Sequence, residues 1–156
     1  MWNEFNWRSI NMSKFEELEK KREIRKIKVD QEKIKKSLEI ARDKLFESKN
    51  LYSAGFYDTA YLTLYTSMFH AARSLLYKDG YQEKSHFSVY QFLLERYSNK
   101  IPKSILNSYD EFRNHRHEIL YGFEGKNSKE EVELAIIDCE DFLEEVKRIH
   151  ERQKSI

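Results

Sequence analysis

Hydrophobic residues recur every three to four positions along most of this 156-residue chain, with charged residues between them. Such spacing places the hydrophobic side chains on one face of an α-helix. The five helices that the pattern predicts span about residues 30–54, 56–78, 85–97, 102–123 and 128–153. The four glycines and the single proline mark their ends: Gly55, Gly80, Pro102, Gly122 and Gly125. Because glycine favours the end of a helix and proline its first turn, and because no segment alternates with a period of two, we predict an all-α protein.

The predicted connections between helices are short, which favours antiparallel neighbours. We therefore expect an antiparallel up-and-down helical bundle over residues 30–153, the size of one domain. Residues 1–29 precede it as a charged N-terminal extension that is partly helical. Residues 13–36 carry more basic than acidic residues and few hydrophobic ones. Two interpretations are open for this segment: a solvated helix or extension, which mixed-sign charge favours, and a basic arm for RNA or a partner protein.

The second predicted helix, residues 56–78, is hydrophobic or aromatic almost all round. An ordinary surface helix has one apolar stripe and one charged face. Other helices or a second subunit must therefore cover this helix on several sides. The excess of apolar surface predicts a homodimer.

Composition narrows the functional classes. The chain has 28 basic and 27 acidic residues and a formal net charge of +1, so any surface that attracts nucleic acid must be local. One cysteine excludes an internal disulfide and a multi-cysteine metal cluster, and a reducing compartment such as the cytoplasm fits best. No apolar run is long enough to cross a bilayer, so we expect no membrane contact. We find no glycine-rich phosphate loop and no metal-ligand spacing in the sequence, and we expect no cofactor and no metal.

The fourth predicted helix carries the densest polar cluster of the chain, and Arg116 falls in the middle of its apolar stripe. An unpaired buried charge is costly, so Arg116 needs a partner, for which Asp58 near the start of the second helix is our candidate. The pair is either a structural ion pair or part of a site in which the Arg116 guanidinium binds phosphate. The predicted stripe consists of Ile105, Tyr109, Phe112, Ile119 and Phe123.

Arg113, His117 and Tyr121 follow one another at helical spacing along the flank of this stripe, and Asn114 follows Arg113. A guanidinium and an imidazole one turn apart could hold a phosphodiester and move a proton. Arginine would stabilise the negative charge, and histidine would act as general base or acid. A surface pair without a role is the simpler interpretation of the spacing alone.

A second candidate site lies at the predicted start of the third helix, where Lys84, Ser85 and His86 follow one another. The free N–H groups of a helix N-terminus can receive an anion, so these three residues could bind phosphate. Capping of the helix by Ser85 explains the serine without a ligand. His70 and Cys139 stand among apolar residues, and we predict that both belong to the core or, for His70, to an interface.

A distinctive set of residues runs through the second helix and the connection after it: Asp58, Ala60, Tyr61, Tyr65, Met68, Phe69, His70, Ala71, Ala72, Leu75, Leu76, Gly80, Lys84, Ser85 and His86. This set resembles the HEPN family (higher eukaryotes and prokaryotes nucleotide-binding domain), specifically its small stand-alone archaeal and bacterial members. The resemblance implies a helical bundle. It also implies a link to RNA, since many HEPN proteins are metal-independent ribonucleases in which two subunits bring an arginine–histidine signature together at the dimer cleft.

Arg113-Asn114 resembles the start of that signature, but only three residues separate Arg113 from His117, fewer than the signature requires. In the other register Arg116-His117 starts the signature, and Tyr121 stands where the histidine is expected. In some toxin-type relatives a partner nucleotidyltransferase modifies a tyrosine just after the histidine, and the resemblance makes Tyr121 the counterpart at a different spacing.

Three functions remain open. The first is a nucleotide- or RNA-associated module that acts with a nucleotidyltransferase-type partner, as in toxin–antitoxin pairs. The second is a metal-independent endoribonuclease with a composite dimer active site containing Arg113, Arg116 and His117. The third is a non-catalytic structural or interaction module.

Overall fold

The computed structural model describes residues 13–123 and 126–154. Over these residues the chain forms six helices and two short strands. The helices are α2 (Lys14–Lys20), α3 (Gln31–Ser53), α4 (Tyr57–Asp79), α5 (His86–Tyr97), α6 (Lys103–Tyr121) and α7 (Lys129–Lys154). The strands are β1 (Ile24–Lys26) and β2 (Tyr81–Glu83). All five predicted helices are confirmed, each with ends within two residues of the prediction.

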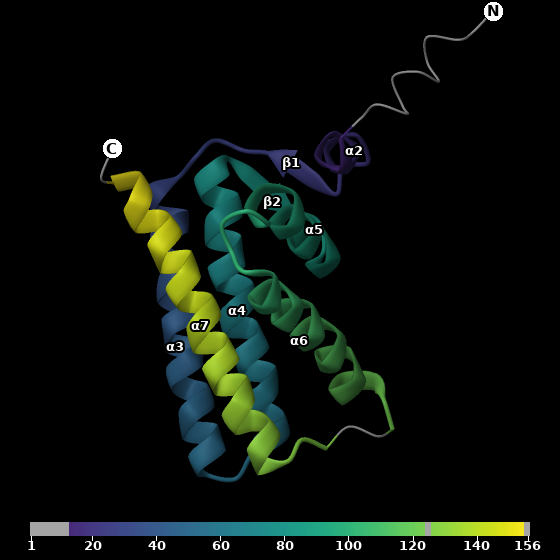
Figure 1. Cartoon of the computed structure of the whole chain (residues 1–156), viewed down its shortest axis with the longest axis vertical. Coiled ribbons are helices and arrows are strands. Elements are labelled where there is room, and N and C mark those ends of the chain that lie inside the picture. Colours follow the sequence, from purple (N-terminus) through teal and green to yellow (C-terminus); the bar gives the residue numbers. More distant parts are fainter. Residues whose placement is uncertain (1–12, 124–125, 155–156) are drawn as a thin grey trace, which may run out of the picture.

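The long helices form an up-and-down bundle (Figure 1). Helix α3 runs antiparallel to α4, α6 returns in the direction of α3, and α7 runs back in the direction of α4. Helix α7 packs against both α3 and α4, whereas α6 crosses α4 at a tilt and α5 is a short helix between α4 and α6. The predicted all-α antiparallel bundle is therefore confirmed.

Helix α4 is the central helix of the bundle. Twelve of its 23 residues are buried, and α3, α5, α6 and α7 all contact it. The aromatic and aliphatic side chains that predicted a covered helix are thus covered within one chain. The burial of these side chains within one chain therefore accounts for the apolar surface of α4 without a second subunit.

The two strands were not predicted. They pair antiparallel, with Ile24 opposite Glu83, and are too short to show a period of two in the sequence. Gly80 connects α4 to β2. It ends α4 in the left-handed conformation with φ of 82°, which glycine adopts without strain. A Cβ atom there would also lie 3.3 Å from the carbonyl oxygen of Ile27.

The described part of the charged N-terminal segment packs on the bundle. Leu18 and Ile24 are buried in the common core, and the Phe15 ring meets Tyr81 edge-on at 5.1 Å. The Arg96 guanidinium lies 4.0 Å from the centre of the Phe15 ring. Residues 13–26 therefore pack on α5 and β2 through a few apolar side chains, while most of their polar side chains remain exposed.

The predicted apolar stripe of α6 is correct at Tyr109 and Phe112, which are buried, and at Ile105 and Ile119, which are half-buried against the core. It is wrong at Phe123, which is fully exposed because α6 ends at Tyr121. Cys139 is buried in the core, as predicted, and burial raises the pKa of its thiol to about 12. None of the described helices combines enough length with enough hydrophobicity to span a membrane.

Candidate functional site

One shallow, open cavity of about 590 Å³ gathers five of the nine predicted site residues. Helix α6 provides most of its wall, and the first residue of α5 provides the rest. The predicted residues that line it are His86, Arg113, Asn114, Arg116 and His117. Two separately predicted sites, one on each helix, therefore form a single surface.

Arg113 is held in place by one carboxylate and two aromatic rings. Its Nε and Nη2 atoms donate hydrogen bonds to Oδ1 of Asp110, at 3.1 and 2.8 Å. Its guanidinium lies 5.0 Å from the centre of the Phe87 ring and 5.8 Å from that of Tyr90. The positive charge is thus oriented, but it is already shared with a carboxylate of the same helix.

Arg116 has a different environment. Its guanidinium lies over the Tyr65 ring, 5.6 Å from the ring centre, in a half-buried position. Within residues 13–123 and 126–154 it makes no ion pair, so the predicted pair with Asp58 is wrong. A ring face attracts a cation and thereby takes the role expected of a carboxylate. Among the described residues, the charge of Arg116 is therefore not shared with a carboxylate in an ion pair.

Asp58 instead anchors the segment that leads into α7. Its Oδ1 accepts hydrogen bonds from the backbone N–H and the side-chain amide of Asn127, at 2.7 and 3.0 Å. The Oδ1 atom of Asn127 lies 2.7 Å from Nε2 of His115, which is the donor in this bond because an amide oxygen can only accept. This chain of contacts ties α4, α6 and the segment before α7 together, and Asp58 itself lies outside the cavity, whereas His115 lines it.

His86 lies between the arginines and the aromatic core. Its Nδ1 atom is 2.8 Å from the Tyr65 hydroxyl, and its ring stacks on Phe69 at 4.2 Å between centres. Burial, and then the positive charge of nearby arginines with Arg116 foremost, lowers the pKa of His86 below its ordinary value of 6.5. The imidazole is therefore neutral at neutral pH, and a bound anion would favour its protonation.

The other predicted site residues lie outside the cavity. Ser85 caps α5 in a reciprocal pair with Ser88: the Ser88 N–H donates to Ser85 Oγ at 3.1 Å, and the Ser85 N–H donates to Ser88 Oγ at 2.9 Å. Lys84 is exposed. Tyr121 is 70% exposed, and its ring lies 5.0 Å from the centre of the His117 ring. The capping interpretation of Ser85 is thus confirmed, and of this trio His86 lines the cavity.

The sequence interpretation missed the residues that hold the arginines, namely Tyr65, Phe87, Tyr90 and Asp110. Only Asp110 carried a signal, because a carboxylate three residues before an arginine on a helix is a recognisable pair. The three rings come from α4 and α5, and only the packing of those helices against α6 brings them near.

The cavity can bind an anion but offers little else. Two guanidinium groups, the Asn114 amide and the imidazoles of His86, His115 and His117 can donate hydrogen bonds to phosphate oxygens. Glu111 and Glu118 also line its outer part and would repel a ligand that extended that way. Among the described residues no three histidine, cysteine, aspartate or glutamate side chains are placed to hold a metal ion.

Comparison with known proteins identifies the family. The family model of the HEPN domain matches residues 34–149, from the first turn of α3 to near the end of α7. A search of curated proteins found no match. Because the match covers most of the chain and the all-α bundle agrees with it, the chain belongs to the HEPN family.

Proposed function

We propose that this protein is a nucleotide- or RNA-associated HEPN module that binds a phosphate group with Arg113, Arg116 and His86. The observation that carries the proposal is that these three side chains, from two helices, line the same cavity. Each can donate hydrogen bonds to phosphate oxygens, His86 through Nε2 when that nitrogen carries a proton, because its Nδ1 atom lies against the Tyr65 hydroxyl. Arginine is especially suited to phosphate because its planar guanidinium forms two parallel hydrogen bonds.

Arg116 is the principal ligand in this proposal. Among the described residues no carboxylate forms an ion pair with it, and the Tyr65 ring orients the guanidinium before a ligand arrives. Such fixing reduces the entropy that binding removes from a long side chain. Arg113 is fixed as well, but it would have to share its hydrogen bonds between Asp110 and the ligand.

An aromatic ring beside the arginines favours a single-stranded RNA over inorganic phosphate. Phe87 lies next to Arg113 and is 49% exposed, so part of its ring remains open to solvent. Aromatic side chains of this kind stack with unpaired bases, at about 1–3 kcal/mol per base. A phosphate held by Arg113 would place an adjoining base within reach of Phe87.

Fluorescence anisotropy with a labelled single-stranded RNA tests the proposal. Replacing both Arg113 and Arg116 by methionine should remove the binding, whereas the matched control Arg25→Met with Arg148→Met, which removes two exposed arginines elsewhere, should keep it. Competition by inorganic phosphate and by a nucleoside monophosphate separates recognition of the phosphate alone from recognition of the base. Equal loss in both double variants, or unchanged binding in both, would contradict the proposal.

The proposal also includes a partner protein. A nucleotidyltransferase-type protein acting with this module, as in toxin–antitoxin pairs, follows from the family resemblance. Co-purification of the tagged chain with proteins from neighbouring genes checks it, and transfer of a nucleotide to the exposed Tyr121 would appear as a mass increase on that residue. An unmodified chain that retains no nucleotidyltransferase would reject this part and leave the phosphate site untouched.

A metal-independent ribonuclease is the second candidate, and the position of His86 favours it. If Nδ1–H donates to the Tyr65 oxygen, Nε2 carries the lone pair and can take the proton of an RNA 2′-hydroxyl. The 2′ oxygen then bonds to phosphorus, and the bond from phosphorus to the 5′ oxygen breaks. Water protonates the 5′ oxygen, and the hydroxide so formed takes the proton back from His86, which leaves a 2′,3′-cyclic phosphate and a neutral imidazole. Arg116 would stabilise the added charge on the phosphate oxygens.

In this scheme His86, and not His117, is the base. Incubation of RNA with the wild-type protein should yield cyclic phosphate ends, detected by mass spectrometry. His86→Asn should abolish them, while the exposed control His117→Asn should leave them unchanged. The absence of cleavage with binding intact would leave the binding module as the function. Absence of both would leave an interaction module without a nucleic-acid ligand.

A further inference from the structure

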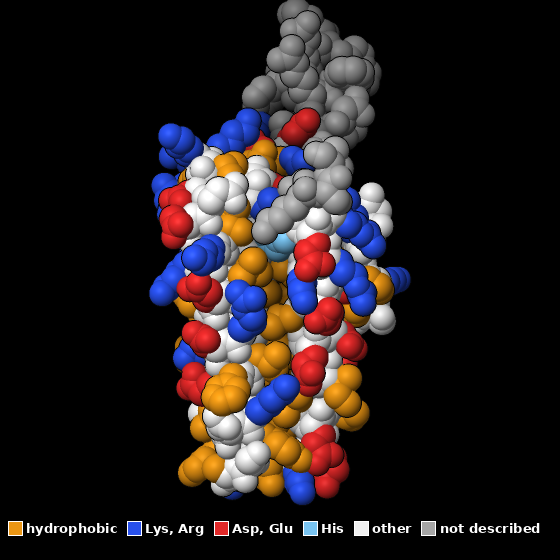
Figure 2. Space-filling model, turned by 90° about the vertical axis from the view of Figure 1, so that its left-hand side faces the viewer, with side chains coloured by type: hydrophobic (Ala, Val, Ile, Leu, Met, Phe, Trp, Pro, Cys, Tyr) orange, Lys and Arg blue, Asp and Glu red, His pale blue; other side chains and the backbone are white. Residues whose placement is uncertain are grey.

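A second surface feature lies on the face formed by α3 and α7. Hydrophobic side chains form a column between the two helices, and charged side chains stand along both sides (Figure 2). The column includes a cavity of about 400 Å³, in which the small side chains of Ala41 and Ala71 leave room for a larger side chain. We call this feature the α3–α7 groove, and its apolar lining consists of Leu38, Ala41, Leu45, Ala71, Leu143 and Val146.

Both walls of the groove repeat every seven residues, which is the period at which one helix packs along another. Each wall has a seam of half-buried side chains at this spacing. The seam of α3 consists of Leu38, Leu45 and Tyr52, and the seam of α7 consists of Ile136, Leu143 and His150. Because the two helices are antiparallel and Lys49 lies 3.7 Å from Glu140 across the groove, Leu45 is level with Leu143. Two facing seams that are each only half-buried form a seat for a further helix.

The two sides of the groove differ in charge. On α3, basic residues also recur every seven positions, at Lys35, Arg42 and Lys49. We call them the basic rim. On α7, the groove side is mostly acidic, with Lys147 as the exception. This acidic rim consists of Glu133, Glu140, Glu144 and Glu151.

The middle of this charge pattern is not neutralised within the part of the chain that the structure describes. There Arg42, Glu144 and Glu151 have no ion-pair partner, although all three line the groove cavity. Beyond the two rims, large hydrophobic side chains are exposed: Phe46 on α3 at 69% and Ile137 on α7 at 54%. An apolar floor, unpaired charged rims and flanking exposed hydrophobic residues are the composition of a surface that another protein covers.

We propose that the α3–α7 groove binds an amphipathic α-helix of a partner protein. The apolar face of that helix covers the two seams, its acidic edge lies along the basic rim of α3, and its basic edge lies along the acidic rim of α7. The seam from Leu38 to Tyr52 is about 21 Å long at the rise of an α-helix, so the bound helix has about four turns. Reversing its direction would exchange its edges and set like charges against each other, so the rims also select the direction of binding.

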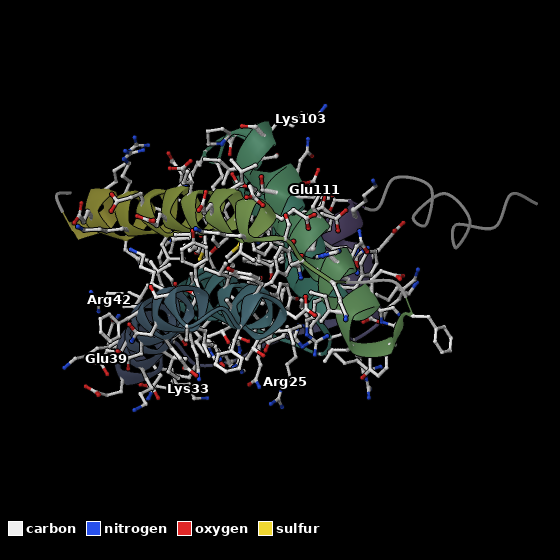
Figure 3. The ribbon with its side chains drawn as sticks, turned by 90° about the horizontal axis from the view of Figure 1, so that it is seen from below. Arg25, Lys33, Glu39, Arg42, Lys103 and Glu111 are labelled. Carbon is white, nitrogen blue, oxygen red and sulfur yellow. The ribbon has the colours of Figure 1, made fainter. Side chains whose placement is uncertain are left out.

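The bound helix leaves the phosphate-binding cavity open. Figure 3 shows Glu39 and Arg42 of α3 on one side of the molecule and Lys103 and Glu111 of α6 on another, with α4 and α7 between them. A helix in the groove therefore does not cover α6, and it does not obstruct the two-subunit cleft that the family resemblance implies. Binding of the partner helix and binding of RNA should accordingly be independent of each other.

Fluorescence anisotropy with a labelled synthetic peptide tests the proposal. The Glu/Lys peptide is an amphipathic helix of about four turns with leucine along one face, glutamate along one edge and lysine along the other. It should bind the wild-type protein saturably, whereas the same peptide with a proline at its centre, which interrupts the helix, should not bind. Reversing the basic rim, with Lys35→Glu and Arg42→Glu, should weaken binding by about tenfold or more. The control Lys26→Glu with Lys103→Glu makes the same charge change on exposed positions outside the groove and should keep the wild-type affinity.

A second peptide with lysine on both edges provides the decisive observation. It should bind the protein with the reversed basic rim more tightly than it binds the wild type, because both of its edges then meet acidic rims. Circular dichroism of each variant checks that the helices remain folded, and the RNA affinity should be the same in all of them. Failure of the Glu/Lys peptide to bind the wild type, or equal binding of both peptides to every variant, would overturn the proposal. So would a solution mass that falls when the basic rim is reversed, since a second copy of the chain would then occupy the groove.

Discussion

The α5–α6 cavity and the α3–α7 groove both combine arginine side chains with apolar surface, yet they combine them in opposite ways. In the cavity, the guanidinium groups rest on aromatic rings and, for Arg113, on a carboxylate. In the groove, Arg42, Glu144 and Glu151 lack ion-pair partners among the described residues, and the apolar floor lies open. The same residue types are thus preorganised in one region and unsatisfied in the other.

This difference indicates two kinds of ligand. A fixed guanidinium suits a small charged group, because orientation and charge are present before the ligand binds. An open apolar floor with unpaired rims gains most from a large surface that buries hydrophobic area and supplies the opposite charges. Substitutions that act on one region and leave the other unchanged are therefore the sharpest tests.

Arg116→Met should give the largest effect on RNA binding. Hydrogen bonds to charged groups contribute about 1.5–3 kcal/mol each, so the dissociation constant should rise by roughly ten- to a hundredfold. Arg113→Met should cost less, because Arg113 already shares its charge with Asp110. Anisotropy titrations of the two single variants decide this order. Equal losses, or a greater loss for Arg113→Met, would show that the carboxylate does not weaken Arg113.

Asp58→Ala should reduce the stability of the fold and spare the cavity. It removes the acceptor of two Asn127 hydrogen bonds, which should lower the free energy of unfolding by about 2 kcal/mol. Denaturant unfolding measures this change, and RNA titration of the folded variant should give the wild-type affinity. A loss of affinity equal to that of Arg116→Met would restore the discarded idea that Asp58 positions Arg116.

Phe46→Glu should act only on the groove. The side chain is 69% exposed in the single chain, so the substitution should leave unfolding almost unchanged. In the proposed complex it would set a carboxylate beside the acidic edge of the bound helix, and the dissociation constant of the Glu/Lys peptide should rise by about tenfold or more. Fluorescence anisotropy measures the dissociation constant, with Phe123→Glu as a control at another exposed phenylalanine. The same shift in both variants would argue against the groove.

The sequence allowed most of the fold to be predicted, because helical periodicity and the position of Gly80 and Pro102 are local signals. Local signals also identified Arg113, Arg116 and His86 as candidates. The pairing of Arg116 with Asp58 was predicted wrongly, since a buried arginine was expected to require a carboxylate and the Tyr65 ring was overlooked. The contact of β1 with β2 and the rings around the arginines depend on distant segments meeting, which no local pattern encodes.

Lowering the pH should reduce the stability of the fold by a smaller amount, through the histidines that burial keeps neutral. Burial is the first cause that lowers the pKa of both His70 and His86. Above pH 6.5, which is the pKa of these histidines in the unfolded chain, the imidazoles are neutral in the folded and the unfolded chain, and the full stability is present. As the pH falls below 6.5 towards the lower pKa of the folded chain, the unfolded chain binds protons first, and stability is lost. The stability difference between wild type and His86→Gln, from denaturant unfolding, should therefore shrink as pH falls. A difference independent of pH would contradict the lowered pKa.

The pKa of His86, followed by NMR of its imidazole carbon-bound protons with and without a nucleoside monophosphate, tests the phosphate site most directly. In the free protein it should lie below 6.5, and Arg116→Met should raise it by removing a neighbouring positive charge. The ligand should raise it in the wild type, because a phosphate between the arginines and His86 favours the charged imidazole. A His86 titration that is unchanged by saturating ligand, while resonances elsewhere shift, would place the binding site outside the cavity and contradict the account.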